Sequence, residues 1–142
     1  MWEQSLWETY RLTADEVLSQ VTKRIDNFQE DPKNPFGSAS LEDYRRSGFD
    51  RGHLAPAADM KWSRKTMEEC FYLSNMSPQN RRCNAGIWNE IENTVRGFAC
   101  SKKSVFIVTG PVVSRNTKTI GLNRVAVPEG FYKVISDEAP PC

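Results

Sequence analysis

The sequence predicts an α+β fold without internal repeats. Short segments rich in apolar, β-branched and aromatic residues are bounded by Gly, Pro, Asn or Ser, which is typical of strands. Residues 84–98 instead repeat apolar side chains every three or four positions, which is typical of an amphipathic helix. With 142 residues, of which 39% are hydrophobic and 26% charged, the chain can bury one sizeable core, so we expect residues 1–142 to form a single domain.

The N-terminal third is expected to contain one strand, one helix and a long loop. Residues 6–12 predict a short strand. Residues 13–16 have the layout of a capping box, which predicts that a helix extending to Val21 begins here. Turn residues dominate residues 31–48 and predict a loop, within which residues 40–43 begin a brief helical turn.

The middle of the chain is expected to form two strands with a short helix between them. Residues 49–54 predict the first strand, and residues 55–57 end it at a proline. Residues 63–69 predict a helix that starts at an N-cap serine. Residues 71–75 predict the second strand, and residues 77–80 predict a turn after it.

The C-terminal part is expected to pack one long helix against further strands. The helix at residues 84–98 has an apolar stripe that we expect to be buried, formed by Ile87, Ile91, Val95 and Phe98. Residues 104–108 predict a strand that ends at Gly110 and Pro111. Residues 124–127 and 131–135 predict two more strands.

Composition disfavours several classes of protein. The formal charge of +1 disfavours passive binding of nucleic acid through a basic face, and no run approaches the ~18 apolar residues of a membrane helix. The opening residues lack the layout of a secretion signal, which indicates either a cytoplasmic protein or a leader absent from this chain. Scattered cysteines and a single histidine disfavour structural zinc and leave disulfides and free thiols both open; the cysteines are Cys70, Cys83, Cys100 and Cys142.

His53, the only histidine, is the first candidate for chemistry. It follows Asp50, Arg51 and Gly52 in an expected strand. A single imidazole cannot build a histidine-rich metal site, so in an enzyme His53 would accept a proton rather than bind a metal. The alternative is an ordinary histidine without a chemical role, which describes most histidines.

A second candidate set lies on the expected long helix. Side chains spaced by four residues project from one helix face, and this spacing relates Asn84, Trp88, Glu92 and Arg96. The alternative is an i,i+4 ion pair between Glu92 and Arg96, with Trp88 in the core. Together with His53, an amide, an acid and a base on one helix face indicate metal-assisted phosphodiester cleavage.

Four motifs occur in the order found in one known family. They are DRGHLAP at residues 50–56, FYLSN at 71–75, NAGIW at 84–88, and Glu92. The chain thereby resembles the DNA/RNA non-specific endonucleases, the family of endonuclease G and secreted bacterial nucleases, from about Trp7 to about Ile135. The resemblance implies a ββα-metal (His-Me finger) fold with a central, mostly antiparallel sheet flanked by helices.

The resemblance also implies a role for individual residues. His53 is the general base that takes the proton of the attacking water. Asn84 is the protein ligand of one divalent ion, Mg²⁺ or alternatively Mn²⁺, because an amide oxygen suits a hard cation that keeps several waters. Glu92 holds metal-bound waters, Arg96 lies near the phosphate, and Asn75 fixes the environment of the histidine.

Several arginines are candidates for contact with the substrate. By the resemblance, Arg51 binds phosphate or braces the histidine motif, and Arg24 corresponds to another phosphate-binding arginine of the family. Arg81 and Arg82 lie just before Asn84 in the sequence. For these two, phosphate contact and a role in solubility are equal alternatives.

The implied function is a sugar-non-specific, divalent-metal-dependent endonuclease that hydrolyses DNA and RNA and leaves 5′-phosphate ends. One alternative is a catalytically silent, truncated nuclease scaffold that only binds nucleic acid or a partner. Another is a sequence-specific homing or HNH-type enzyme, which would need an added recognition element. We expect a nuclease domain that is C-terminally incomplete relative to the family, has no membrane partner and is secreted or periplasmic; a homodimer and an inhibitor protein stay open as partners.

Overall fold

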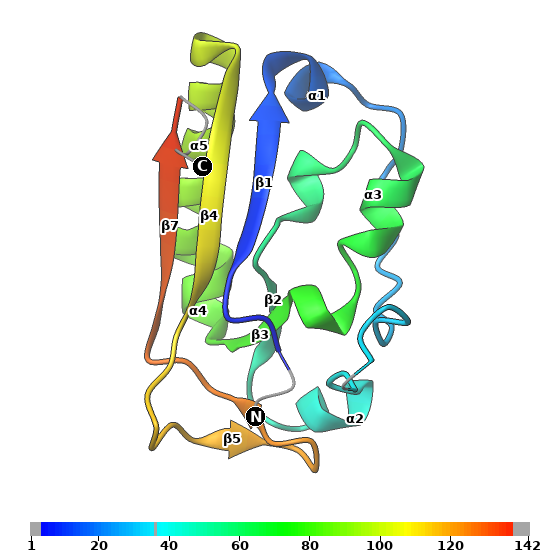
Figure 1. The fold of residues 1–142 in the computed structure, drawn as a ribbon, viewed down its shortest axis with the longest axis vertical. Coiled ribbons are helices and arrows are strands. Elements are labelled where there is room, and N and C mark those ends of the chain that lie inside the picture. The colour runs from blue at the N-terminus through cyan, green and yellow to red at the C-terminus, as the bar shows by residue number, and fades with distance from the viewer. Residues whose placement is uncertain (1–3, 36, 138–142) are drawn as a thin grey trace.

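A three-stranded antiparallel sheet runs through the computed structural model, which describes residues 4–35 and 37–137 (Figure 1). Its strands are β1 (Glu8–Thr13), β4 (Ser104–Val112) and β7 (Gly130–Ser136), in the order β1-β4-β7. The central strand pairs Ile107 with Tyr10 on one side and with Ile135 on the other. The predicted α+β class with an antiparallel sheet is confirmed.

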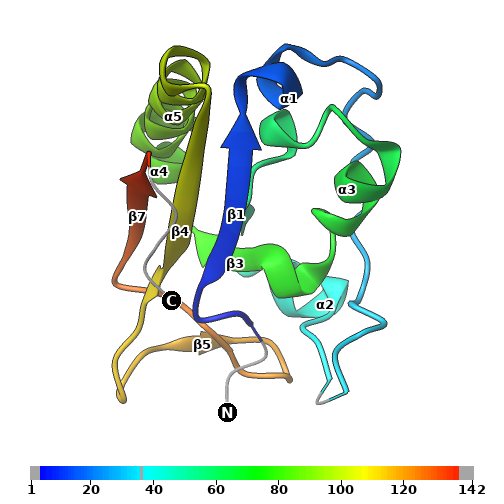
Figure 2. The same ribbon diagram turned by 45° about the horizontal axis from the view of Figure 1, so that its top comes forward.

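The long helix α5 (Asn89–Lys102) packs against this sheet (Figure 2). Alternate side chains of each strand face the helix, since successive residues of a strand point to opposite sides. The buried side chains between helix and sheet are Leu12, Val95, Ala99, Val105 and Ile107. This cluster fixes α5 relative to β4, so residues at the N-terminal end of the helix are presented beyond the sheet.

A separate two-stranded antiparallel sheet carries the histidine motif. It consists of β2 (Asp50–His53) and β3 (Met76–Gln79). His53 pairs with Met76, and Gly52 pairs with Ser77. A Cβ atom on Gly52 would lie 2.7 Å from Cβ of Gln79, so only glycine fits this close approach.

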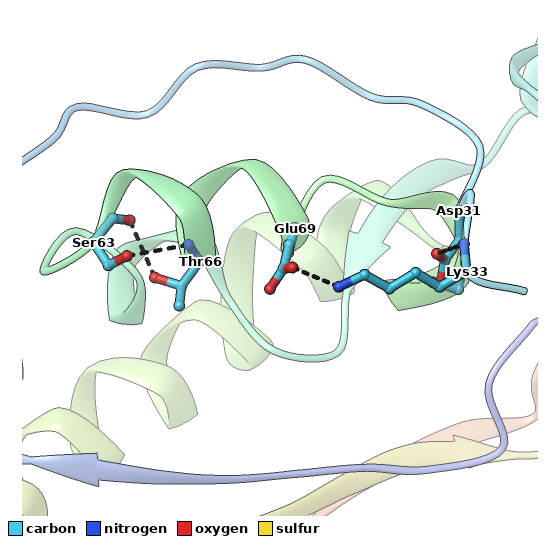
Figure 3. A network of polar contacts seen from close by, with 6 residues as sticks. Asp31, Lys33, Ser63, Thr66 and Glu69 are labelled. Carbon is cyan, nitrogen blue, oxygen red and sulfur yellow. Dashed lines mark hydrogen bonds and ion pairs between the residues drawn. The ribbon is translucent and has the colours of Figure 1, made fainter.

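The loop before β2 is fastened to the segment that links the two strands (Figure 3). Lys33 Nζ pairs with Glu69 Oε1 at 2.7 Å, and the Lys33 backbone N–H donates to Asp31 Oδ1 at 2.8 Å. A parallel β-bridge joins Gln29 to Tyr72. These contacts hold the loop beside the end of β2, where the functional site is built.

Short helices begin at capping residues as the sequence predicts. They are α1 (Ala14–Leu18) after Thr13, α2 (Leu41–Tyr44) after Ser40, and α3 (Arg64–Glu69) after Ser63, whose hydroxyl accepts from the Thr66 backbone N–H (Figure 3). The expectation that α1 extends to Val21 is wrong. Leu18 is 73% exposed and Ser19 is already extended, so no core contact sustains a further turn.

The predicted second strand is misplaced. Residues 73–75 form the 3₁₀ turn η2 (Leu73–Asn75), and the strand lies at 76–79, where a turn was expected. The reason is Asn75, whose side-chain amide bonds the backbone of Ala55 and Cys70 and fixes the turn. Pro78 is tolerated because β3 has a partner strand on one side only.

Strand β4 continues through Gly110 and Pro111 instead of ending there. β1 pairs with β4 only as far as Thr109, so Pro111 lies where β4 has a partner on one side, and its missing N–H donor is tolerated. A small two-stranded sheet precedes β7. Its strands are β5 (Thr119–Ile120), which the sequence analysis did not predict, and β6 (Val125–Ala126), which it did.

The chain enters α5 through an irregular helical segment. It comprises α4 (Arg81–Cys83) and the π-helical turn η3 (Asn84–Trp88). Gly86 departs from helical geometry there, at φ −104° and ψ −112°. The wide turn rotates Ile87, which is 58% exposed, away from the core, and Ala99 occupies the buried position at the far end while Phe98 is 47% exposed. The predicted apolar stripe is therefore wrong at both ends.

Two further expectations concern the whole chain. Within residues 4–35 and 37–137, no helix is both long and apolar enough to cross a membrane. The thiols of Cys70, Cys83 and Cys100 are free. Cys142 lies outside the described residues.

Candidate active site

His53 ends β2, and two aromatic rings enclose its imidazole. The centroid of Phe71 lies 4.9 Å away, edge-on, and that of Phe28 lies 5.9 Å away. Within the described chain, the buried Nε2 atom has no hydrogen-bond partner. Burial, together with the charges of Arg24 and Arg51, lowers the pKa of His53 to about 3. The imidazole is therefore neutral near neutral pH, with one ring nitrogen unprotonated.

Arg24 and Arg51 lie on the aromatic rings that flank the histidine. The guanidinium carbon of Arg51 is 4.2 Å from the Phe28 ring centroid, and that of Arg24 is 5.1 Å from the Phe71 centroid. Both side chains thus carry positive charge to the mouth of the His53 site while stacking on apolar surface. The structure brings these two predicted arginines together with the predicted base.

Asn84 faces the same region from the start of the π-helical turn. Its Nδ2 atom donates a hydrogen bond to Asp50 Oδ2 at 3.1 Å, which leaves Oδ1 as the free acceptor of the amide. A cleft of about 320 Å³ brings together Asn84 and Asp50 with Arg24 and Arg51. Two strand-borne residues, one loop arginine and one helix amide thereby converge on one cleft.

Asn75 supports the chain directly after the histidine. Its Oδ1 accepts from the Ala55 backbone N–H at 2.9 Å, and its Nδ2 donates to the carbonyls of Ala55 and Cys70 at 2.9 and 2.8 Å. The Leu54 backbone N–H donates to the Asn75 carbonyl at 3.0 Å. Asn75 therefore fixes backbone rather than contacting the imidazole by a hydrogen bond.

A group of charged side chains around the buried Asp59 lies outside the residues that line this cleft. Arg96 Nη1 pairs with Asp59 Oδ1 at 2.6 Å, and Tyr10 Oη donates to Asp59 Oδ2 at 2.8 Å. The i,i+4 pair of Glu92 with Arg96, the alternative considered for the sequence, is not what the structure shows, because Asp59 is the ion-pair partner of Arg96. Lys133 of β7 reaches the same group.

Burial dominates the titration of this group. It raises the pKa of Glu92 to about 7; the negative charge of Asp59 adds to the effect, and Lys133 and Arg96 oppose it. The pKa of Asp59 is raised by burial and that of Lys133 is lowered by burial. Glu92 can therefore exchange a proton near neutral pH, which an exposed glutamate cannot do.

Arg81 and Arg82 are exposed and lie apart from the His53 cleft. Together with Gly48, Asn80 and Ala85 they line a second, shallower depression. Ala85 of this depression directly follows Asn84 of the cleft in the sequence. The structure thus places these arginines outside the residues that line the cleft, and phosphate contact and solubility remain the two alternatives for them.

The fold defines a class of protein, those built on a ββα unit, with His53 on the two-stranded sheet and Asn84 at the start of the helical segment that follows it. The comparisons with known proteins give the family. The chain matches the DNA/RNA non-specific endonuclease family over residues 3–141 and belongs to it.

Individual relatives agree with this assignment. The chain is 38% identical to human mitochondrial endonuclease G, over 95% of this chain and 49% of that protein. It is 41% identical to mouse mitochondrial nuclease EXOG, over 91% of this chain and 38% of that protein. A crystal structure of the EndoG/EndoGI complex matches with a TM-score of 0.83 and 38% identity, over 91% of this chain and 58% of that one. The ββα fold expected from the resemblance is confirmed.

The comparisons also correct one expectation. These two relatives are mitochondrial nucleases, so the expectation of a secreted or periplasmic enzyme is wrong. That expectation depended on the bacterial members of the family rather than on any residue of this chain. The chain spans about half the length of the human relative it matches.

Sequence reasoning missed three residues that shape the site. Phe28 lies in the loop yet covers the imidazole, Asp59 holds Arg96, and Lys133 comes from the last strand. Each acts through contacts between segments far apart in the sequence. Asp59, six positions after His53, was the only one of them with a local sequence signal, and an acidic residue at that position is equally typical of a turn.

Proposed function

We propose that this chain is a divalent-metal-dependent endonuclease that hydrolyses phosphodiester bonds of DNA and RNA, with His53 as general base and Asn84 as metal ligand. The observation that carries the proposal is a neutral, enclosed imidazole beside a cleft where an amide oxygen and two arginines converge. Family membership supports the activity, and the geometry supports the roles.

The donor set of the cleft fits Mg²⁺ or Mn²⁺. Within residues 4–35 and 37–137, His, Cys, Asp and Glu side chains form no group of three or more suited to a metal ion. Asn84 Oδ1 and the neighbouring Asp50 carboxylate are both hard oxygen donors. Such an ion, with few protein ligands, keeps several waters and, when bound, stabilises negative charge on the phosphoryl and leaving oxygens.

The side chains of this chain supply the remaining chemistry. Arg24 and Arg51 bind the phosphate and orient it in the cleft. His53 takes the proton of the attacking water, which makes the water nucleophilic towards phosphorus. Because the two arginine charges lower the pKa of His53, a phosphate anion that neutralises them raises its affinity for the proton when the substrate binds.

Further residues serve the reaction from its edges. We infer that Glu92 holds metal-bound water, that Arg96, held by Asp59, stabilises charge on the phosphate, and that Asn75 keeps the His53 strand in place. Arg81 and Arg82 contact phosphates next to the scissile one. These groups address the backbone rather than base edges, so the enzyme does not select a sequence. An inhibitor protein is a further proposed partner, since EndoG was solved with EndoGI.

Cleavage of supercoiled plasmid tests the proposal. The parent, His53→Ala, Asn84→Ala and the control Asn116→Ala, which changes an exposed loop asparagine, are compared with Mg²⁺, with Mn²⁺ and with EDTA. We expect cleavage only with metal, a loss of about 10²-fold or more in His53→Ala and Asn84→Ala, and parental activity in the control. Asn84→Ala should also bind Mn²⁺ more weakly by electron paramagnetic resonance. A folded parent that binds DNA but cleaves with neither ion would instead establish the silent scaffold.

A further inference from the structure

Lys133 is a half-buried cation on the face of β7 that packs against α5. Alternation along the strand places Phe131, Lys133 and Ile135 on one face, and Ile135 packs against the core under α5. A lysine in this row breaks the apolar pattern. Removing an ammonium group from water costs free energy unless hydrogen bonds and opposite charges compensate. The contacts of the Lys133 ammonium group therefore indicate its role.

Those contacts converge on the histidine strand. Lys133 Nζ donates to the carbonyl of Leu54 at 3.2 Å, and Leu54 is the residue directly after His53. The same ammonium lies 4.9 Å from the ring centroid of Trp88. The Trp88 indole Nε1 donates to the His53 carbonyl at 3.4 Å. One ammonium group therefore holds two consecutive carbonyls, one directly and one through an indole.

Trp88 in turn is fixed from two sides by β7. Phe131 contacts it with ring centroids 5.5 Å apart, while the Lys133 ammonium lies over its ring. Trp88 is the last residue of the π-helical turn that begins with Asn84. The same lysine thus connects the segment that carries the proposed base with the segment that carries the proposed metal ligand.

We propose that Lys133 is a positioning residue, which sets the distance between the His53 strand and the Asn84 turn by holding the Leu54 carbonyl and the Trp88 ring together. This inference rests on the proposed function. It assigns to β7, which contributes no group to the cleft, a part in the reaction. Removing the ammonium group frees the Leu54 carbonyl and the Trp88 indole. His53 and Asn84 are then no longer held at a fixed distance by one shared group.

The test compares Lys133→Met, which keeps the apolar stem, with Lys133→Arg, which keeps charge and donors, and with the control Lys118→Met at an exposed lysine. In folded Lys133→Met we expect kcat on plasmid to fall about tenfold or more with KM within about threefold of the parent. Lys133→Arg should recover most of the loss, and Lys118→Met should match the parent. If Lys133→Met does not fold, Lys133→Gln is measured in its place.

A second readout separates this inference from the proposed function. The indole N–H resonance of Trp88 and the amide resonance of Leu54 should shift in Lys133→Met and return in Lys133→Arg, whether or not the parent cleaves DNA. An inactive parent with these shifts would refute the endonuclease proposal and leave Lys133 as the tie between the two segments. A folded Lys133→Met with parental kcat, or with both resonances unmoved, would overturn the positioning role.

Discussion

Acidification from about pH 7 to about pH 5 should destabilise the protein through His53 by about 2 kcal/mol. In the unfolded chain the imidazole has its ordinary pKa of about 6.5. In the folded protein, burial between Phe28 and Phe71, together with the charges of Arg24 and Arg51, lowers the pKa of His53 to about 3. Between these values the unfolded chain binds a proton that the folded protein does not, so the stability from neutral His53 is complete above about pH 6.5 and is lost as the pH falls towards 3.

The magnitude follows from the width of that window. Each pH unit below 6.5 costs about 1.4 kcal/mol, which gives about 2 kcal/mol at pH 5. Glu92 has the opposite sign. Its pKa of about 7 lies above the unfolded value, so its contribution is present at low pH and is lost as the pH rises through 7. The parent alone therefore reports a mixture of the two effects.

Comparison with His53→Asn isolates the histidine. Urea unfolding of the parent and of this variant, followed by tryptophan fluorescence at about pH 7 and about pH 5, gives two changes in unfolding free energy. The Glu92 contribution is common to both proteins and cancels in their difference. We expect a difference of about 2 kcal/mol, with the parent losing more. A difference below about 0.5 kcal/mol would show that His53 is hydrated and would refute the enclosure argument.

Two further substitutions probe the packing around the site. Asp59→Asn removes the charge that holds Arg96, and breaking a buried ion pair from one side should cost about 3–5 kcal/mol in urea unfolding, where a loss below about 1 kcal/mol would contradict the pairing. Gly52→Ala should lower the free energy of unfolding by about 2 kcal/mol or more because the new Cβ meets Gln79. The control Gly97→Ala, with open space around it on α5, should raise the free energy of unfolding by about 0.5–1 kcal/mol. Equal melting temperatures of the two variants would contradict the close approach at Gly52.

Local patterns predicted those parts of the fold that local forces determine. The capping boxes at Thr13 and Ser40 start helices because both partners lie within four residues of each other. The strand at 76–79 was missed because the side chain of Asn75 bonds backbone of residues 20 positions earlier and five positions earlier, which fixes a turn where apolar residues suggest a strand. Pro78 then misled the prediction, since it is compatible with a strand only at a one-sided edge.

The same division applies to the site. His53 and Asn84 stand out in the sequence because each lies in a compact motif; Asn84 lines the cleft, and His53 contacts Phe28 of its wall. Their roles stay proposals, since the comparisons give the family and the fold. Asp59 and Lys133 act across 37 residues to Arg96 and across 79 residues to Leu54, respectively, and no spacing rule reaches over such separations. Only the tertiary contacts of Asp59 with α5 and of β7 with Leu54 reveal them.

The charges of this protein are divided between two environments that have different consequences. Asp59, which is buried, and the half-buried Glu92, Arg96 and Lys133 form a set of two acids and two bases, whose formal charges cancel. Burial still shifts the pKa values of Asp59, Glu92 and Lys133 towards their neutral forms, and the opposite charges within the set counteract that shift. Arg24 and Arg51, in contrast, stack on Phe71 and Phe28 at the cleft and keep donors available to a phosphate. The cleft also contains the carboxylates of Asp26 and Asp50, and Arg24 pairs with Asp26 at 2.6 Å. In the proposed site, the remaining guanidinium donors rather than a net positive charge would therefore bind a phosphate.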